Sequence, residues 1–196
     1  MKQQPYYFIG IGGIGMSSIA RFLLQHDCIV GGYDKTPSPI TQALEKEGAT
    51  IVYEQSVAAL PAQFQSKETK VIYTPAIPFG HPQKDYFEQQ GNSVVKRSVF
   101  LGEITKDKPT LAVAGTHGKT TTTAILAHLF SSLGEAFTAF VGGVMNQKNT
   151  NLVSTGLDTI LVEADEFDRS FLQLSPSIGC ITSVDADHLD IYGTEE

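Results

Sequence analysis

The sequence predicts an α/β protein in which parallel sheets carry helices on their faces. Short β-rich runs alternate with helical patterns from one end of the chain to the other, which is the order that builds a parallel sheet. Two glycine-rich turns each follow an apolar strand and open a helix. Hydrophobic residues are 41% of the chain and charged residues 18%, a balance typical of globular proteins.

The first half of the chain predicts strands separated by amphipathic helices. The helices end where glycine follows them, at Gly48 and Gly91, and apolar residues in the first helix are spaced four apart. We expect strands at 6–9, 28–33, 50–53, 70–74 and 93–96, and helices at 16–25, 40–47, 83–90 and 99–105.

A charged stretch closed by proline, 106–109, predicts a domain boundary. We expect one domain over 1–107 and a second over 108–196. In the second domain the patterns predict strands at 110–114, 136–141, 159–163 and 178–184. A helix at 119–132 carries Ile125, Leu126, Leu129 and Phe130 on one face. The chain stops soon after a core strand, so we expect this domain to be incomplete.

The charge balance and the apolar segments exclude two classes of partner. Fourteen Lys and Arg residues against 21 Asp and Glu give a net charge of −7, so we expect no broad nucleic-acid surface. No segment approaches the roughly 20 apolar residues of a membrane span. Cys28 and Cys180 lie in apolar runs, which predicts reduced core cysteines, with a disulfide as the alternative. Glycines at 10–15 interrupt the apolar run near the N-terminus, so we expect a cytoplasmic protein.

The first glycine turn, GIGGIG at 10–15, follows a strand and opens a helix, as in a Rossmann-like nucleotide-binding domain. Glycines let the backbone approach a phosphate closely, and the helix N-terminus favours an anion. Asp34 ends the second strand, near the position where such domains bind a ribose hydroxyl. Alone, this pattern equally fits an NAD-dependent oxidoreductase, a sensor domain or a UDP-sugar site. Close helix packing is the alternative explanation for the glycines.

The second glycine turn, AGTHGKTT at 114–121, predicts an ATP phosphate loop, although Val113 stands where the usual pattern has its first glycine. Lys119 can bind the terminal phosphates and Thr120 can join a Mg²⁺ shell. The alternative is a glycine-rich turn with a solvated lysine. Because such loops need a carboxylate at another strand end, Glu163 is the expected metal ligand, with Asp165 and Glu166 in supporting or solvated roles. His188 follows a further strand and could bind a second metal or a phosphoryl group, or simply cap a helix.

Five segments together resemble the Mur ligases of peptidoglycan synthesis. They are GIGGIGMS at 10–17, YTPAIP at 73–78, AGTHGKTTTT at 114–123, EADEFDRSFL at 163–172 and DADHLDIYG at 185–193. They occur in the family's order and cover nearly the whole chain. Within the family, the resemblance is strongest to members that join L-alanine to UDP-N-acetylmuramate, with the murein-peptide recycling ligases as an alternative.

The resemblance implies a Rossmann-like UDP-sugar domain followed by the first part of a P-loop ATPase domain, with a third domain absent from this chain. It implies ATP and Mg²⁺ as cofactors, UDP-N-acetylmuramate and L-alanine as substrates, and an isolated chain that is inactive or only binds ligand. The residues implied for ATP are Gly115, Thr116, His117, Gly118, Lys119, Thr120 and Thr121, with Lys119 and His188 catalytic. The metal ligands implied are Thr120, Glu163 and His188. The UDP-sugar residues implied are Gly12, Gly13, Ile14, Gly15, Asp34, Thr74, Pro75 and Ala76.

Overall fold

The computed structural model describes residues 4–145, 150–165 and 167–185. By its internal contacts the chain divides into two compact units, Met1–Phe100 and Leu101–Glu196. The division falls within helix α4, Arg97–Thr105, whereas the sequence places it after that helix, between 107 and 108. The boundary at 107/108 therefore stays a prediction.

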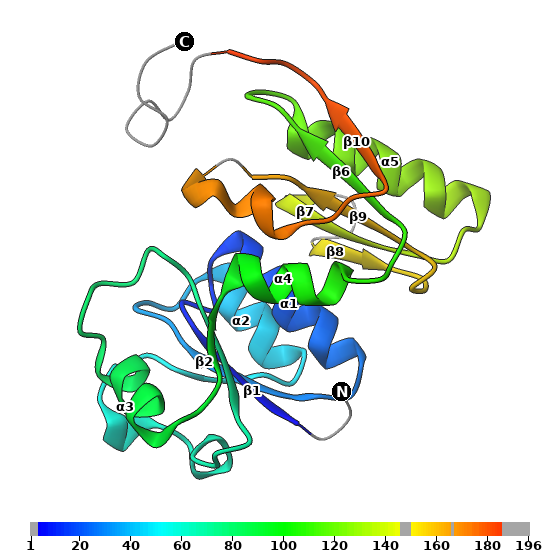
Figure 1. Cartoon of the computed structure of the whole chain (residues 1–196). Coiled ribbons are helices and arrows are strands. Elements are labelled where there is room, and N and C mark those ends of the chain that lie inside the picture. Colours follow the sequence, from blue (N-terminus) through cyan, green and yellow to red (C-terminus); the bar gives the residue numbers. More distant parts are fainter. Residues whose placement is uncertain (1–3, 146–149, 166, 186–196) are drawn as a thin grey trace. The chain divides into compact units, whose positions relative to one another are not determined.

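The first unit is a five-stranded parallel sheet in the order β3-β2-β1-β4-β5. In Figure 1, α1 and α2 lie together on one face of this sheet and α3 lies on the other. This arrangement confirms the predicted Rossmann-like fold. The strands are β1 Pro5–Ile9, β2 Ile29–Tyr33, β3 Thr50–Val52, β4 Lys70–Tyr73 and β5 Val94–Lys96, and the helices are α1 Ile14–Gln25, α2 Pro39–Lys46 and α3 Pro82–Gln90, with 3-10 turns Val57–Ala59 and Ala62–Phe64.

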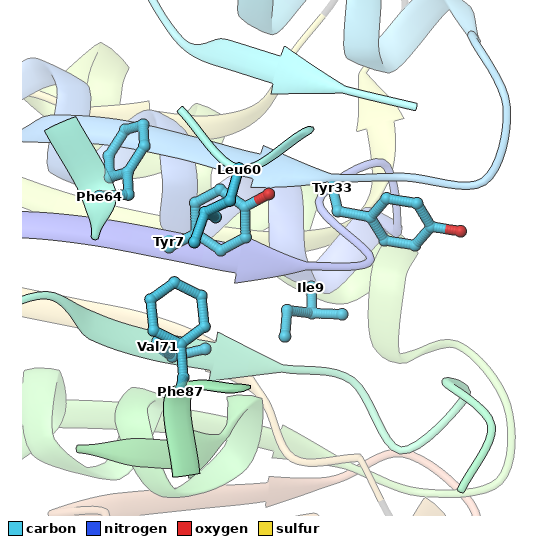
Figure 2. Close-up of a cluster of buried hydrophobic side chains, with 7 residues drawn as sticks. All are labelled: Tyr7, Ile9, Tyr33, Leu60, Phe64, Val71 and Phe87. Carbon is cyan, nitrogen blue, oxygen red and sulfur yellow. The ribbon is translucent and has the colours of Figure 1, made fainter. Parts of the chain in front are cut away.

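An aromatic cluster forms the core beneath α3 (Figure 2). The ring of Tyr7, on the central strand β1, lies 5.3 Å from that of Phe64 and 5.4 Å from that of Phe87, centroid to centroid. All three side chains are fully buried. The Tyr7 hydroxyl is buried as well and donates to Gln83 Oε1 at 2.9 Å, so the one polar atom of this ring is satisfied.

The second unit is a five-stranded sheet in the order β10-β6-β9-β7-β8, with α5 packed against β6, β9 and β7. Its core joins the inner face of α5, including Ala127, to buried residues of β7, β8 and β9 such as Phe137, Val153 and Leu161. The elements are β6 Thr110–Ala114, α5 Lys119–Leu133, β7 Phe137–Met145, β8 Thr150–Ser154, β9 Thr159–Glu163, a 3-10 segment Phe167–Gln173 and β10 Ile178–Ile181.

Three expectations for this unit are wrong. Strand β8 has no counterpart in the sequence-based prediction, and it pairs antiparallel with β7 at the edge of an otherwise parallel sheet. Cys180 is exposed, because β10 lies at the edge of the sheet among the described strands and pairs there with β6, while Cys28 is buried as expected. Ile125 and Leu129 are 55% and 49% exposed, whereas Leu126 and Phe130 pack against the core, so the four residues do not share one face of α5.

Within the described ranges, every helix falls short of the length and apolar character that a membrane-spanning segment needs.

Candidate functional site

The first glycine loop joins β1 to α1 at the carboxyl edge of the first sheet. Gly10 has φ +88°, a conformation that favours glycine, and a Cβ there would lie 2.5 Å from Thr74 Cγ2. The Gly10 and Ile11 N–H groups both donate to the Tyr33 carbonyl, at 2.8 and 3.0 Å. The loop is thus hydrogen-bonded to the end of β2 and packs against the segment that follows β4. Ligands of open α/β sheets bind at this edge.

Asp34 is the polar anchor of the first loop. Its Oδ2 accepts a hydrogen bond from the Gly12 N–H at 2.7 Å, and a Cβ on Gly12 would lie 2.8 Å from the same oxygen. Any larger residue than glycine at position 12 would therefore displace the carboxylate. The structure brings Gly12 and Asp34 together and shows that Asp34 holds the loop itself. Its contact with a ribose stays a prediction.

The segment after β4 forms a short turn beside the loop. The Thr74 N–H donates to the Ile9 carbonyl at 3.3 Å, and the Ile77 N–H donates to the Thr74 carbonyl at 3.2 Å. Pro75 and Ala76 are exposed at this turn. The predicted UDP-sugar residues therefore converge from β1, β2 and β4 on one edge of one sheet.

The second glycine loop joins β6 to α5 in the second unit. Gly115 has φ +125° and Gly118, which precedes the helix, has φ +83°, so both positions favour glycine. The Lys119 ammonium donates to the Gly115 carbonyl at 2.5 Å and to the Thr116 carbonyl at 3.4 Å. Its charge is thus held over the loop at the start of α5.

The segment after β10 braces this loop. The Thr116 N–H donates to the Ser183 carbonyl at 3.1 Å, and the His117 N–H donates to Ser183 Oγ at 3.0 Å. The Thr182 hydroxyl bonds to the His117 carbonyl. Two of the amides expected to face phosphate thus bind protein atoms here. Sequence reasoning missed Ser183, and its only signal was its place just beyond an apolar strand.

Glu163, at the end of β9, lies beside the head of α5. Its Oε2 accepts from the Thr120 hydroxyl at 3.0 Å and its Oε1 accepts from the Gly142 N–H at 2.5 Å. A Cβ on Gly142 would lie 2.4 Å from Oε2, so the glycine makes room for the carboxylate. Gly142 is a second residue that the sequence reading missed, although two consecutive glycines inside a strand are a usable signal.

Burial raises the pKa of Glu163 above its ordinary value, and the nearby charge of Asp165 acts in the same direction. Hydrogen bonds from Gly142 and Thr120 and the charge of Lys119 oppose this rise. A half-buried carboxylate beside a lysine and a hydroxyl offers the oxygen donors that Mg²⁺ prefers, so Thr120 and Glu163 fit a magnesium ion.

Parts of the predicted metal site lie outside the described residues, namely His188 and Glu166. Among the residues that are described, no group of three or more His, Cys, Asp or Glu side chains gathers closely enough to hold a metal. Beside the head of α5 a cavity of about 510 Å³ runs along the helix, lined by residues of α5, β7 and β8 that include Thr120 and Thr121.

Comparisons with known proteins place both units in one family. The model of the Mur ligase family catalytic domain matches residues 5–109, and the Mur ligase middle domain matches residues 113–196. A UDP-N-acetylmuramate–L-alanine ligase of Flavobacterium johnsoniae is 52% identical over 190 residues, which are 97% of this chain and 42% of that protein. The corresponding ligase of Parabacteroides distasonis is 52% identical over 197 residues, or 100% of this chain and 43% of that protein.

Solved structures agree with the sequence comparisons. The UDP-N-acetylmuramate-alanine ligase of Thermotoga maritima superposes with a TM-score of 0.86 at 31% identity, covering 97% of this chain and 44% of that one. A murein peptide ligase of Psychrobacter arcticus gives a TM-score of 0.80 at 27% identity, covering 95% and 44%. The chain thus spans less than half the length of these relatives. On the family models, which match both of its units, the chain belongs to the Mur ligase family.

Proposed function

We propose that the protein containing this chain is an ATP-dependent ligase that joins L-alanine to the lactyl carboxylate of UDP-N-acetylmuramate. The observation that carries the proposal is the grouping of Lys119, Thr120 and Glu163 at the head of α5, in a chain half identical to relatives named for this reaction. The same relatives do not favour a dinucleotide oxidoreductase or a peptide-recycling ligase.

We assign the UDP-sugar to the first domain, 1–107, and ATP to the second, 108–196. The loop at 10–15, Asp34 and the turn at 74–76 converge on one sheet edge, which suits a nucleotide sugar. The loop around Lys119 and Thr120 suits a triphosphate. Its other residues are Gly115, Thr116, His117, Gly118 and Thr121. Binding of ATP by this loop requires the Thr116 and His117 amides to be shared with Ser183 or released from it.

The proposed reaction needs charge control more than covalent chemistry. ATP would activate the lactyl carboxylate as an acyl phosphate, and the amine of L-alanine would then displace phosphate to form the amide. Lys119 would offset negative charge on the transferring phosphoryl group, where phosphoryl transfer needs most help. Thr120 and Glu163 would hold Mg²⁺, which supplies further charge neutralisation when bound. His188 is the proposed additional ligand and catalytic group.

The proposed compartment is the cytoplasm, where cysteines such as the exposed Cys180 stay reduced.

The experiment uses the full-length protein with UDP-N-acetylmuramate, ATP, Mg²⁺ and a panel of amino acids, and it measures phosphate release. We expect release with L-alanine preferred. Lys119→Ala should lower turnover by roughly a hundredfold or more, because an electrostatic partner of the transition state is lost. UDP-sugar binding should be nearly unchanged, since Lys119 lies in the second unit. Lys108→Ala, at an exposed position in the same domain, is the matched control. No phosphate release with any amino acid would refute the proposal.

A further inference from the structure

Arg97, the first residue of α4, lies directly against the first glycine loop. A Cβ built on Gly15 would be 2.3 Å from Arg97 Nη1 and 3.1 Å from both Cδ and Cζ. Gly15 is the second residue of α1, so the guanidinium covers the first turn of that helix. The contact exists because Gly15 has no side chain, which gives this glycine a reason beyond loop flexibility.

We propose that Arg97 binds the diphosphate of the nucleotide sugar, together with the backbone amides at the start of α1. This inference rests on the proposed function, because it deepens the same UDP-sugar site. The first N–H groups of a helix have no acceptor within it, and they attract anions. Arginine adds a planar cation with several donors, whose geometry matches phosphate oxygens. Arg97 is half-buried and so has an accessible part.

Charge explains why the first loop needs such a residue. The second loop has its own cation, Lys119, whereas the segment 10–15 consists only of glycine and isoleucine. The chain has a net charge of −7, and the carboxylate of Asp34 already occupies the Gly12 N–H. A diphosphate placed at this loop would therefore meet a negative charge and one fewer amide. The guanidinium on Gly15 supplies the missing positive charge.

The proposal predicts which part of the ligand Arg97 recognises. A contact to the diphosphate discriminates UDP from uridine, while a purely structural arginine would affect both alike. A charge-assisted hydrogen bond contributes about twice as much as a neutral one, so loss of Arg97 should weaken UDP binding by about tenfold.

The test titrates the 196-residue chain with UDP and with uridine, by calorimetry and by ligand-observed NMR. We expect Arg97→Gln to raise the Kd for UDP by about tenfold and to leave the Kd for uridine unchanged. Arg97→Lys should recover part of the loss. Lys67→Gln removes an exposed charge elsewhere in the same unit and is the matched control.

A second variant disturbs the contact between Arg97 and Gly15 while leaving the arginine charge in place. Gly15→Ala places a methyl group where the guanidinium lies, and the flexible end of Arg97 can move aside without disturbing the fold. Gly15→Ala should weaken UDP binding selectively, and the double variant should be no weaker than Arg97→Gln alone.

The outcomes separate this inference from the proposed function. Equal losses of UDP and uridine affinity, or no change in either, would overturn the role of Arg97 while leaving the UDP-sugar site intact. Failure of the unaltered chain to bind UDP at all would overturn both.

Discussion

At the scale of single residues, His81 is a buried polar group that the proposed chemistry does not use. It is 1% exposed, and neither ring nitrogen has a hydrogen-bond partner among the described residues. Its ring lies against Tyr33, with 4.8 Å between centroids. Burial lowers the pKa of His81 below its ordinary value, although the charge of Asp85 opposes this. The folded protein thus holds a neutral histidine, which becomes easier to protonate on unfolding.

This burial predicts a loss of stability in mild acid. Between the lowered folded pKa and the unfolded value of about 6.5, the unfolded chain binds more protons, so the free energy of unfolding falls as pH falls. His81 alone should change the free energy of unfolding by at most about 1.4 kcal/mol per pH unit. Urea unfolding from pH 8 to pH 5 measures it. His81→Phe, which keeps a ring against Tyr33, should show a shallower slope, and an identical slope in the variant would contradict the assignment.

Gly15 and Gly142 show what a glycine does at each of the two candidate sites. At position 15 the missing Cβ admits a guanidinium, and at position 142 it admits the Glu163 carboxylate. Neither role follows from the glycine pattern alone, because each depends on a side chain distant in sequence. The motif locates the site, and the fold determines what fills the space.

At the scale of elements, the start of α2 supports the first glycine loop. Ser38 Oγ accepts from the Thr41 N–H at 3.2 Å, and the Ser38 N–H donates to Thr41 Oγ1 at 2.8 Å, which forms a reciprocal cap. Thr41 is buried, and its Cγ2 would lie 2.9 Å from a Cβ on Gly12. The cap therefore fixes both the helix and a wall of the loop.

Removing this cap should destabilise the first unit. Ser38→Ala leaves the Thr41 N–H without its side-chain acceptor and should lower the free energy of unfolding by about 1 kcal/mol. Ser38→Asp keeps an acceptor in place and should retain most of the stability. Chemical denaturation of the three proteins provides the comparison. Equal stabilities for Ser38→Ala and the unaltered chain would show that the cap contributes nothing measurable.

The sequence predicts the elements around each glycine loop well, because strand, turn and helix there are neighbours along the chain. It predicts the β1-loop-α1 unit and the place of Asp34 at the end of the second strand. It misses β8, a short and polar strand that forms only by pairing with β7. It also misses Ser183 and Arg97, whose contacts join residues 66 or more positions apart. Such contacts depend on tertiary packing, which local patterns do not encode.

At the scale of the whole molecule, each unit contains a hydrophobic cluster drawn from its own residues. Phe64 belongs to the aromatic cluster of the first unit, and Phe137 belongs to the core between α5 and the second sheet. Both side chains are fully buried. We therefore propose that the two units unfold as separate cooperative domains, with UDP bound to the first and ATP to the second.

Matched cavity variants test this proposal by calorimetry. Phe64→Ala should lower the midpoint temperature of only the unfolding transition that UDP shifts upwards. Phe137→Ala should lower the midpoint temperature of only the transition that ATP shifts upwards. Each variant should lower the free energy of unfolding of its own unit by about 3 to 5 kcal/mol, because a large buried ring is lost and the core closes only partly over the cavity. Ligand that binds only the folded state raises the transition of the domain that holds it, so each transition can be assigned independently of the variants. A single transition that both variants lower equally would mean that the chain unfolds as one unit.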